Sequence, residues 1–440
     1  MKAPDRVVLL TVASPLFPEA AARDLMGRSA GTSPAVTPIS VLAHDKASAA
    51  SALSELKPDR IAGLVVQLST FATAEILHDV LAALGDRKIP IALWALEERG
   101  EIITNSLCGV QLWASTLVRF GHRPTVLIGD PEGAVGNDLD AFAAAARAQA
   151  ALSSAQIALV GSHADWFTNL AVEPATLHRI VGATVRQVSL QAFIQSCKAT
   201  PESEVAASTR WDDTIFDGGD NAVGKATMGQ TFARLDAGLS AIKADAIAIR
   251  DWPEILYADG FRGTWAALGE LSDRAAPIAP EGDVMGAATA VAVRAMLPES
   301  LPFLTDISGL DRDNDRLVLW HYGVSPRLSN GPRHVDAAMK QESFPLKSGP
   351  MTLIRLSLRP GGELRIFVAE GTLLAEPTGA NRAAGYFQPS NGGAEALVRG
   401  FIAAGYEHHV TAVYGRLAHA AAHLAHAMGA KLDGPGAWNG

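Results

Sequence analysis

Short apolar runs alternate with longer helical patterns from the start of the chain. Strands are predicted at RVVLLTVA, ISVLAH, IAGLVVQLS, IPIALWAL and TVLIGD, and helices near residues 19–26, 74–84 and 110–120. These strands are continuously apolar and lack period-two alternation, which is typical of a parallel sheet covered by helices on both faces. The pattern predicts a first α/β domain over residues 1–155.

The same pattern restarts in the middle of the chain. AQIALVGS, ATVRQVSL and ADAIAIRD are predicted strands, joined by a helix near residues 225–242 with Met228, Phe232 and Leu239 on its apolar face. A second α/β domain with its own sheet is therefore expected over residues 156–316.

The last part of the chain is rich in predicted strands. RLVLWHYGV, HHVTAVYG and the hairpin LIRLSL-RPGG-ELRIFVA favour an antiparallel sheet or small barrel over residues 317–440, followed by a helix near residues 417–428. The expected fold is α/β, with two Rossmann-like α/β domains followed by a β-rich C-terminal domain.

Composition narrows the class of protein. Of the 440 residues, 48% are hydrophobic and 19% are charged, which is typical of a folded globular chain. The net charge of -9 and the lack of a basic stripe argue against nucleic acid or an anionic membrane as a partner. No segment approaches the ~18 unbroken apolar residues of a membrane-spanning helix.

Two further features indicate a reducing compartment. Cys108 and Cys197 are too few for a disulfide framework or a thiolate metal site. The apolar run VVLLTVA is short and follows Asp5 and Arg6, so a first strand is a better interpretation than a secretion signal. We expect a cytoplasmic protein.

Glu281 is the first candidate for chemistry. It lies in the turn PEGDV, where Gly282 allows a close backbone approach and a helix follows. An acidic residue at this place can also act as a helix cap, and Asp283 fits that role as well or better.

Asp306 is the second candidate, because it follows the apolar strand LPFLT. In α/β sheets, polar groups at the carboxyl ends of strands face the ligand crevice. An Asx turn is the simpler alternative. Asp311, Asp313 and Asp315 read as a solvated turn, since a calcium loop would need a glycine and a distal glutamate.

Three histidines, His321, His408 and His409, lie against apolar strands. A lone strand histidine is more often a hydrogen-bonded core residue than a ligand. Carboxylates combined with imidazole suit Mn²⁺ or Mg²⁺ better than zinc. A dinucleotide fingerprint, a phosphate loop and a G-x-S-x-G motif are all missing. The terminal histidines His419, His423 and His426 have helical spacing and indicate an amphipathic or interfacial helix.

Several segments, in this order, resemble the L-fucose/L-arabinose isomerase family, in particular its fucose-isomerase-like members. They are VVQLSTFAT (65–73), NSLCGVQLWASTLVRFG (105–121), IRDWPE (249–254), PEGDVMGA (280–287), FLTDI (303–307), LWHYG (319–323) and GYEHHVTAVYG (405–415). The resemblance implies two α/β domains, a β-rich domain, and aldose–ketose isomerisation at a Mn²⁺ site through a cis-enediol.

The resemblance also implies roles for single residues. Glu281 and Asp306 match the two carboxylates that bind the metal and exchange protons with the sugar. One histidine of the pair His408–His409 matches the C-terminal metal-binding histidine; His409 is the preferred assignment and His408 the alternative. His321 and His408 are expected to contact the substrate. A trimer or hexamer is expected as well.

Two departures leave the substrate open. Tyr322 stands where the family has a small cysteine, and Ala279-Pro280 precedes the EGDV turn. A pentose, a 6-deoxyhexose or a modified hexose such as a sulfo-sugar fits the resemblance. Arg250 is a candidate for an anionic group and Trp252 for the sugar, although a surface ion pair is the alternative for Arg250. A non-catalytic sugar-binding or regulatory protein on the same fold is the alternative function.

Overall fold

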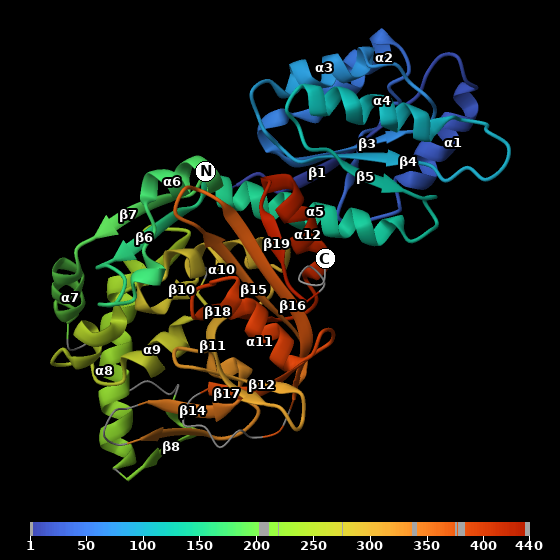
Figure 1. Cartoon of the computed structure of the whole chain (residues 1–440). Coiled ribbons are helices and arrows are strands. Elements are labelled where there is room, and N and C mark those ends of the chain that lie inside the picture. The colour runs from blue at the N-terminus through green and yellow to red at the C-terminus, as the bar shows by residue number, and fades with distance from the viewer. Residues whose placement is uncertain are drawn as a thin grey trace. The chain divides into compact units, whose positions relative to one another are not determined.

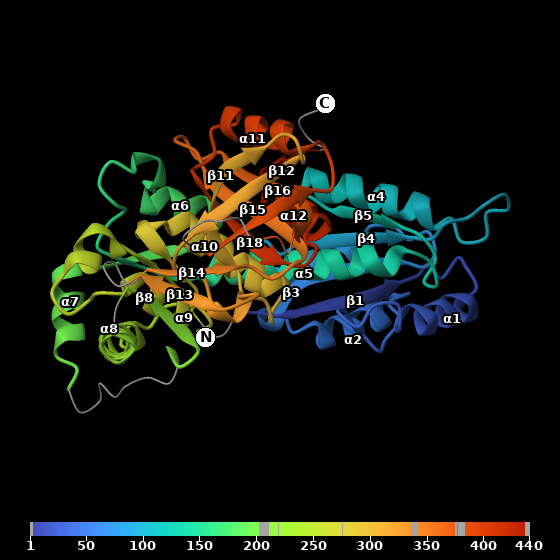
Figure 2. The ribbon, with the colours of Figure 1, turned by 90° about the horizontal axis from the view of Figure 1, so that it is seen from below.

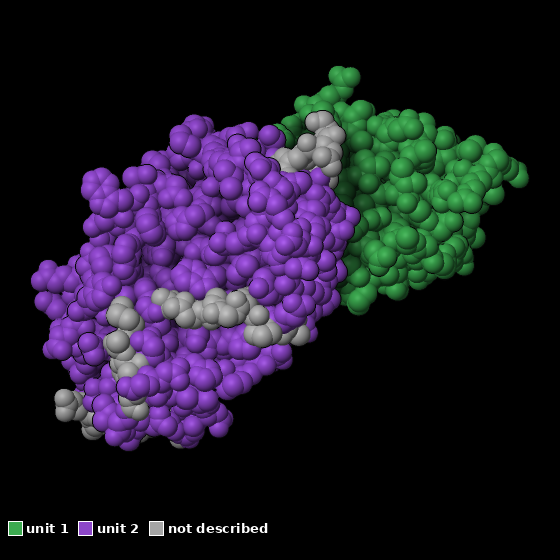
Figure 3. Space-filling model, turned by 60° about the horizontal axis from the view of Figure 1, so that its bottom comes forward, with its two compact units in different colours: residues 1–151, 419–430 green, residues 152–418, 431–440 purple. Residues whose placement is uncertain are grey.

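The computed structural model describes residues 3–201, 211–218, 220–274, 276–336, 341–374, 376 and 383–435. The chain forms two compact units, residues 1–151 with 419–430 and residues 152–418 with 431–440 (Figure 3). The predicted second domain falls within the second unit. The predicted third domain does so except for residues 419–430, which belong to the first unit. The predicted boundaries at residues 155/156 and 316/317 stay predictions.

The first unit contains a five-stranded parallel sheet of order β2-β1-β3-β4-β5. Its strands are β1 (Arg6–Val12), β2 (Thr37–Pro38), β3 (Ile61–Leu68), β4 (Ile91–Ala95) and β5 (Thr125–Ile128). Its helices are α1 (Glu19–Ser29), α2 (Lys46–Leu56), α3 (Glu75–Leu84), α4 (Ser106–Arg119), α5 (Val135–Ser154) and α12 (Ala418–Met428). This is a doubly wound strand order, and the predicted parallel sheet is confirmed.

One predicted strand in this unit is wrong. ISVLAH contributes only an isolated bridge between Ala43 and Val12, and the edge strand β2 is the two residues before it. Pro38 lacks a backbone donor, and the N–H of Ser40 donates to the Glu55 side chain at 3.2 Å. Backbone hydrogen bonds to β1 continue from the N–H groups of Ile39, at 2.8 Å, and Ala43, at 3.0 Å, but they form no regular strand.

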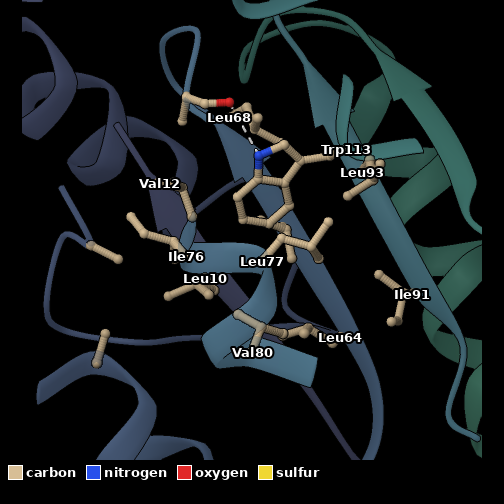
Figure 4. Close-up of a cluster of buried hydrophobic side chains, with 14 of the residues drawn as sticks. Leu10, Val12, Leu64, Leu68, Ile76, Leu77, Val80, Ile91, Leu93 and Trp113 are labelled. Atoms are coloured by element: carbon tan, nitrogen blue, oxygen red, sulfur yellow. Dashed lines mark hydrogen bonds between the residues drawn. The ribbon is translucent and has the colours of Figure 1, made fainter. Parts of the chain in front are cut away.

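Helices cover both faces of this sheet (Figure 1). On one face, side chains of α2, α3 and α4 meet Leu10, Val12 and Leu64, with Trp113 in the middle of the cluster (Figure 4). The Trp113 indole N–H donates to the carbonyl of Ala72 at 3.2 Å, so this buried donor is satisfied. The other face packs against α5. Burial on both faces explains the continuously apolar strands.

The second unit begins with a smaller parallel sheet of order β10-β9-β6-β7. Its strands are β6 (Gln156–Val160), β7 (Thr184–Val188), β9 (Ala246–Ile249) and β10 (Ile278–Ala279), and its helices are α6 (Pro174–Val181), α7 (Leu190–Lys198), α8 (Asn221–Ser240), α9 (Thr264–Leu271) and α10 (Val284–Met296). Met228 and Leu239 of α8 are buried as predicted. The mixed α/β class is confirmed, whereas the Rossmann-like character of both domains stays a prediction.

Six antiparallel strands of the same unit close into a barrel. They are β11 (Phe303–Asp311), β12 (Arg316–His321), β15 (Gly349–Leu358), β16 (Leu364–Leu374), β17 (Ala383–Pro389) and β18 (His409–Tyr414), in the order β16-β15-β18-β11-β12-β17. Pairing of β16 with β17 closes the ring. The predicted β15–β16 hairpin and the β-rich C-terminal region are confirmed.

Further elements extend and cover the barrel. The sheet continues through β14 (Glu342–Pro345), β13 (Arg333–Asp336) and β8 (Thr214–Asp217), and β19 (Lys431–Asp433) pairs with β16. Helix α11 (Ala394–Ala403) lies over β11, β12 and β17 (Figure 2). The helical turns η1 (Pro58–Arg60), η2 (Thr168–Leu170) and η7 (Pro326–Leu328) complete the connections.

Helix α10 lies between the second parallel sheet and the barrel, in contact with β9, β15 and β18. Eleven of its 13 residues are buried. Such a helix is apolar all round because it has no solvent face. Its N-terminus therefore meets strand ends from both sheets, and the candidate residues gather there.

Two other features concern membrane insertion and internal cavities. None of the helices among the described residues is long and apolar enough to cross a membrane. A cavity of about 540 Å³ lies between α8 and the segment 256–262, and its lining includes none of the predicted site residues.

Candidate active site

The turn η6 (Pro280–Gly282) holds Glu281 in a left-handed backbone conformation, with φ 60°. Gly282 also has a positive φ of 72°, and a Cβ there would lie 2.3 Å from the carbonyl oxygen of Ser162. The predicted close backbone approach is confirmed. A left-handed conformation is costly for glutamate, so the fold must hold it in place.

Hydrogen bonds fix this turn from two sides. The backbone N–H of Glu281 donates to Asp251 Oδ1 at 2.6 Å, and the N–H of Ala164 donates to the Glu281 carbonyl at 3.0 Å. Asp251 also accepts from the Trp265 indole at 2.7 Å. Burial, with the nearby charge of Glu281, raises the pKa of Asp251 to about 7.

The carboxylate of Glu281 is buried among three polar side chains. The Tyr322 hydroxyl donates to Oε1. His409 Nε2 lies 3.1 Å and His408 Nε2 3.4 Å from Oε2. Burial alone would raise the pKa of Glu281, but the interactions with His408 and His409 outweigh it and hold this pKa well below its usual range. The carboxylate is therefore ionised at neutral pH.

Asp283 caps α10, as one reading of the sequence predicted, since its Oδ1 accepts from the Gly286 N–H at 2.7 Å. It has a second role. Arg355 donates to Asp283 through Nη1 at 2.5 Å and Nη2 at 3.0 Å, and His409 Nδ1 lies 3.0 Å from Asp283 Oδ2. Arg355 is fully buried and also reaches Glu407 at 3.2 Å. This network was not predicted, although an arginine inside the apolar strand LIRLSL was its one sequence signal.

His409 is thus held between two carboxylates. Burial lowers its pKa, but the neighbouring carboxylates of Asp283 and Glu281 outweigh this and raise the pKa of His409 to about 9. The Nδ1–H donates to Asp283, so Nε2 is the atom that faces Glu281. That contact is close but lacks good hydrogen-bond geometry, and Nε2 has no hydrogen-bond partner within the described residues.

Asp306 lies directly opposite His409 on the neighbouring strand, in the register of β11 and β18. The expectation that Asp306 follows a strand of the parallel sheet is wrong, because β11 is an antiparallel barrel strand and Asp306 lies inside it. An apolar run such as LPFLT fits either kind of strand, so the sequence could not tell them apart. Asp306 Oδ1 is buried and has no hydrogen-bond partner in the part of the chain that the structure describes.

His321 ends β12 and is 1% exposed. Its Nδ1–H donates to the Tyr322 carbonyl at 2.8 Å, which leaves Nε2 with a free lone pair. Burial lowers the pKa of His321 and favours the neutral ring.

Two groups of potential metal ligands share His409. Glu281, His321 and His409 form one, and Asp306, His408 and His409 form the other, with the ligand atoms of each group within 4.8 Å of one another. The structure therefore brings five of the seven predicted site residues together, with the two predicted carboxylates in different groups. Their roles in binding and catalysis stay predictions.

Trp252 and His408 line one side of this cluster. Trp252 stacks on Phe167, with ring centroids 5.8 Å apart, and Phe167 meets His408 edge to face at 5.0 Å. Asn169 Nδ2 lies 3.0 Å from His408 Nδ1, so the His408 Nε2–H is directed at Glu281. These aromatic rings form an apolar wall next to the carboxylates.

Arg250 is already engaged by the protein. It donates to both oxygens of Glu254 at 2.6 Å, to Ser162 Oγ and the His163 carbonyl at 2.9 Å, and to Asp165 at 3.0 Å. Its hydrogen bonds to Glu254 and Asp165 raise its pKa further. Arg250 supports the segment that packs on Gly282, and its role as a substrate ligand stays a prediction.

Tyr322 was noted in the sequence only as a departure from the family pattern. Its ring stacks on Trp265 with centroids 3.8 Å apart, and its hydroxyl reaches Glu281. Burial and the nearby Asp251 and Glu281 charges raise the pKa of Tyr322 well above its usual value, so it remains a hydrogen-bond donor.

Comparison with known proteins shows which proteins this chain resembles. Residues 342–434 match the family described as L-fucose isomerase, C-terminal domain. Sulfoquinovose isomerase of Priestia megaterium is 24% identical over 381 residues, which cover 82% of this chain and 83% of that protein. Sulfoquinovose isomerase of Alkalicoccus urumqiensis is 26% identical over 347 residues, 73% of each chain. The chain is therefore similar to fucose-isomerase-like proteins over most of its length and is a sugar aldose–ketose isomerase.

Proposed function

We propose that this isomerase converts sulfoquinovose, a sulfonated hexose, into its ketose, with a divalent metal ion and a cis-enediol intermediate. The observation that carries the proposal is that Glu281, Asp306 and three histidines form two ligand groups at the start of α10 that share the buried His409. The proposed substrate is taken from the relatives, which are sulfoquinovose isomerases and match this chain over most of their length.

The donor set fits a divalent metal ion. Asp306 Oδ1 and His409 Nε2 are buried atoms without a hydrogen-bond partner among the described residues, and a cation that displaces the Nε2 proton would satisfy both. The Asp283–His409 contact resembles the carboxylate–histidine pairs that orient metal ligands. Carboxylate oxygens with imidazole favour Mn²⁺ or Mg²⁺. Glu281, Asp306 and His409 would hold the ion, and His321 Nε2 is a further ligand candidate.

Each side chain has a defined task in the proton transfer. The ionised Glu281 accepts a proton from the sugar carbon, and Asp306 is the second acid–base group. The Tyr322 hydroxyl holds Oε1 of Glu281, so Oε2 faces the histidines. Trp252, Phe167 and His408 form a face on which the sugar stacks. A bound cation would stabilise the negative charge that develops on the two sugar oxygens.

The substrate is tested with a panel of sugars. Purified protein with Mn²⁺ is incubated with sulfoquinovose, 6-deoxyglucose, L-fucose and L-arabinose, and ketose formation is followed by NMR. We expect the highest kcat/KM with sulfoquinovose, and 6-deoxyglucose, which lacks the sulfonate, as a poorer substrate. A preference for L-fucose or L-arabinose would contradict the substrate while leaving the isomerase class intact.

The site is tested with two conservative variants. Glu281→Gln and Asp306→Asn keep the shape of each side chain but remove its charge. We expect each to lose roughly 10²–10⁴-fold in kcat and to bind less Mn²⁺ than the wild type. Full activity in both variants would exclude these residues as the acid–base pair.

Two broader expectations belong to this proposal. We propose that the protein is a homo-oligomer, trimeric or hexameric, which light scattering in solution can measure. We also propose that it acts in the cytoplasm, where fractionation of the native host would find it.

A further inference from the structure

A second cluster of metal-binding side chains lies in the first unit, on α5 and α12. Asp138, His419 and His423 offer ligand atoms that all lie within 4.8 Å of one another. His419 Nε2 is 3.1 Å from Asp138 Oδ1, and the rings of His419 and His423 are 4.9 Å apart. None of these residues belongs to the isomerase site described above.

The spacing of the two histidines supports ligand binding. They are four residues apart on α12, which places both imidazoles on one helix face, one turn apart. A tetrahedral site with ligands at 2.0–2.1 Å separates neighbouring ligand atoms by roughly 3.3 Å. Asp138 and His419 already lie near that separation. His419 and Asp138 are half-exposed, so small rotamer changes can bring His423 into the same shell.

His423 supplies an independent observation. Its Nε2 is buried and has no hydrogen-bond partner among the residues that the structure describes. The ring meets Phe142 edge to face, with ring centroids 6.3 Å apart. The Asp138–His419 ion pair explains those two side chains without a metal. It leaves the buried nitrogen of His423 unexplained.

We propose that Asp138, His419 and His423 bind a transition-metal ion of the zinc type, which links α12 to α5. Two imidazoles and one carboxylate, with a fourth position open to water, form a nitrogen-rich set that favours Zn²⁺ over Mn²⁺ or Mg²⁺. The isomerase site is richer in carboxylate, so the two sites differ in metal preference. The ion has a structural role, because it fastens α12 to α5 within the first unit.

The third histidine of α12 provides a matched control. His426 is exposed, and its Nε2 lies 3.1 Å from the Pro124 carbonyl. A His426→Ala variant removes the same side chain from the same helix and leaves the cluster intact. It therefore separates loss of the site from general damage to α12.

The test counts bound zinc. Full-length protein is stripped with a chelator and dialysed against Zn²⁺ alone, and bound zinc per chain is measured by mass spectrometry. We expect His419→Ala/His423→Ala to bind one ion fewer than the wild type and the His426→Ala variant. The single variant Asp138→Asn, at a half-exposed position, should weaken zinc binding by about ten-fold or more. Zn²⁺ should raise the melting temperature of the wild type by more than that of the double variant.

Two results would overturn the proposal. Equal zinc content in the wild type and the double variant excludes the site, and so does an equal loss in the His426→Ala variant. Circular dichroism of the zinc-free proteins confirms that the variants are folded. Zinc content is measured without substrate, so failure of this proposal and failure of the isomerase proposal are seen separately.

Discussion

Asp306 and His409 face each other across adjacent antiparallel strands of the barrel, β11 and β18. Directly opposite residues in such a pair have their Cβ atoms about 4.5–5.5 Å apart. A slip of one residue would turn one of the two side chains to the other face of the sheet. Strand register therefore sets the distance between a carboxylate and the histidine that both ligand groups share.

Asp283 is expected to position His409. In Asp283→Asn, the amide cannot hold the Nδ1–H of His409 as a carboxylate does. Mutation of such a hydrogen-bond partner of a metal ligand lowers metal affinity by about 10–100-fold. Isothermal titration with Mn²⁺ should show an increase in Kd in that range.

The same change also loosens the buried pair with Arg355. Glu407→Gln is the matched control, because it weakens Arg355 from its other side and leaves His409 untouched. If both variants lose the same metal affinity, the effect comes from Arg355 and not from the orientation of His409.

Tyr322→Phe removes one hydroxyl and keeps the stack on Trp265. Glu281 Oε1 then loses its donor and the carboxylate can rotate, so we expect kcat to fall by about ten-fold or more with little change in stability. Steady-state kinetics and thermal melting check the two parts. Unchanged kcat would show that the hydroxyl does not orient Glu281.

Gly282→Ala is expected to abolish activity. The added Cβ meets a backbone carbonyl at 2.3 Å, so the turn must shift, and a displacement of 1 Å at a catalytic group can cost about 10²-fold in rate. Gly361→Ala serves as the control, because Gly361 also has a positive φ but its Cβ would meet nothing within 4 Å. That variant should lose roughly 1–2 kcal/mol of stability and retain full kcat.

Arg250→Lys tests whether Arg250 binds an anionic group of the substrate. Its donors are engaged by Glu254, Asp165 and neighbouring groups, so we expect reduced stability and an unchanged ratio of KM for sulfoquinovose to KM for 6-deoxyglucose. A selective rise in KM for the sulfonated sugar would instead show direct contact with the sulfonate.

Glu342 predicts a pH dependence of stability. It is buried beside Arg333, and burial outweighs that charge and raises the pKa of Glu342 from 4.5 to about 8. Between these values the folded protein keeps a proton that the unfolded chain has lost, so stability falls as pH rises through this range. The slope contributed by this group is at most about 1.4 kcal/mol per pH unit.

Glu342→Gln removes this contribution. Urea unfolding at pH 5 and pH 8 should show a smaller loss of stability for the variant than for the wild type across this range. Equal losses would mean that Glu342 is ionised in the folded protein at neutral pH.

Local patterns in the sequence were enough to predict the parallel sheets, the β15–β16 hairpin and the C-terminal helix, because apolar periodicity and turn residues act over a few positions. They were also enough to predict the close backbone approach at Gly282 and to select a short set of candidate site residues. ISVLAH shows the limit, since this apolar run at the sheet edge forms separate backbone hydrogen bonds to β1, and its Ser40 N–H donates to the Glu55 side chain instead.

Only the tertiary structure decided how these residues meet. It paired β11 with β18 in a barrel. It made Asp283 orient His409 in addition to capping α10. It also engaged the donors of Arg250 in hydrogen bonds to groups of the protein itself. Each of these contacts joins positions far apart in the chain or depends on side-chain competition inside a packed interior. The sequence by itself determined which chemical groups are present and the type of most local elements, whereas long-range packing and strand register set the distances between those groups.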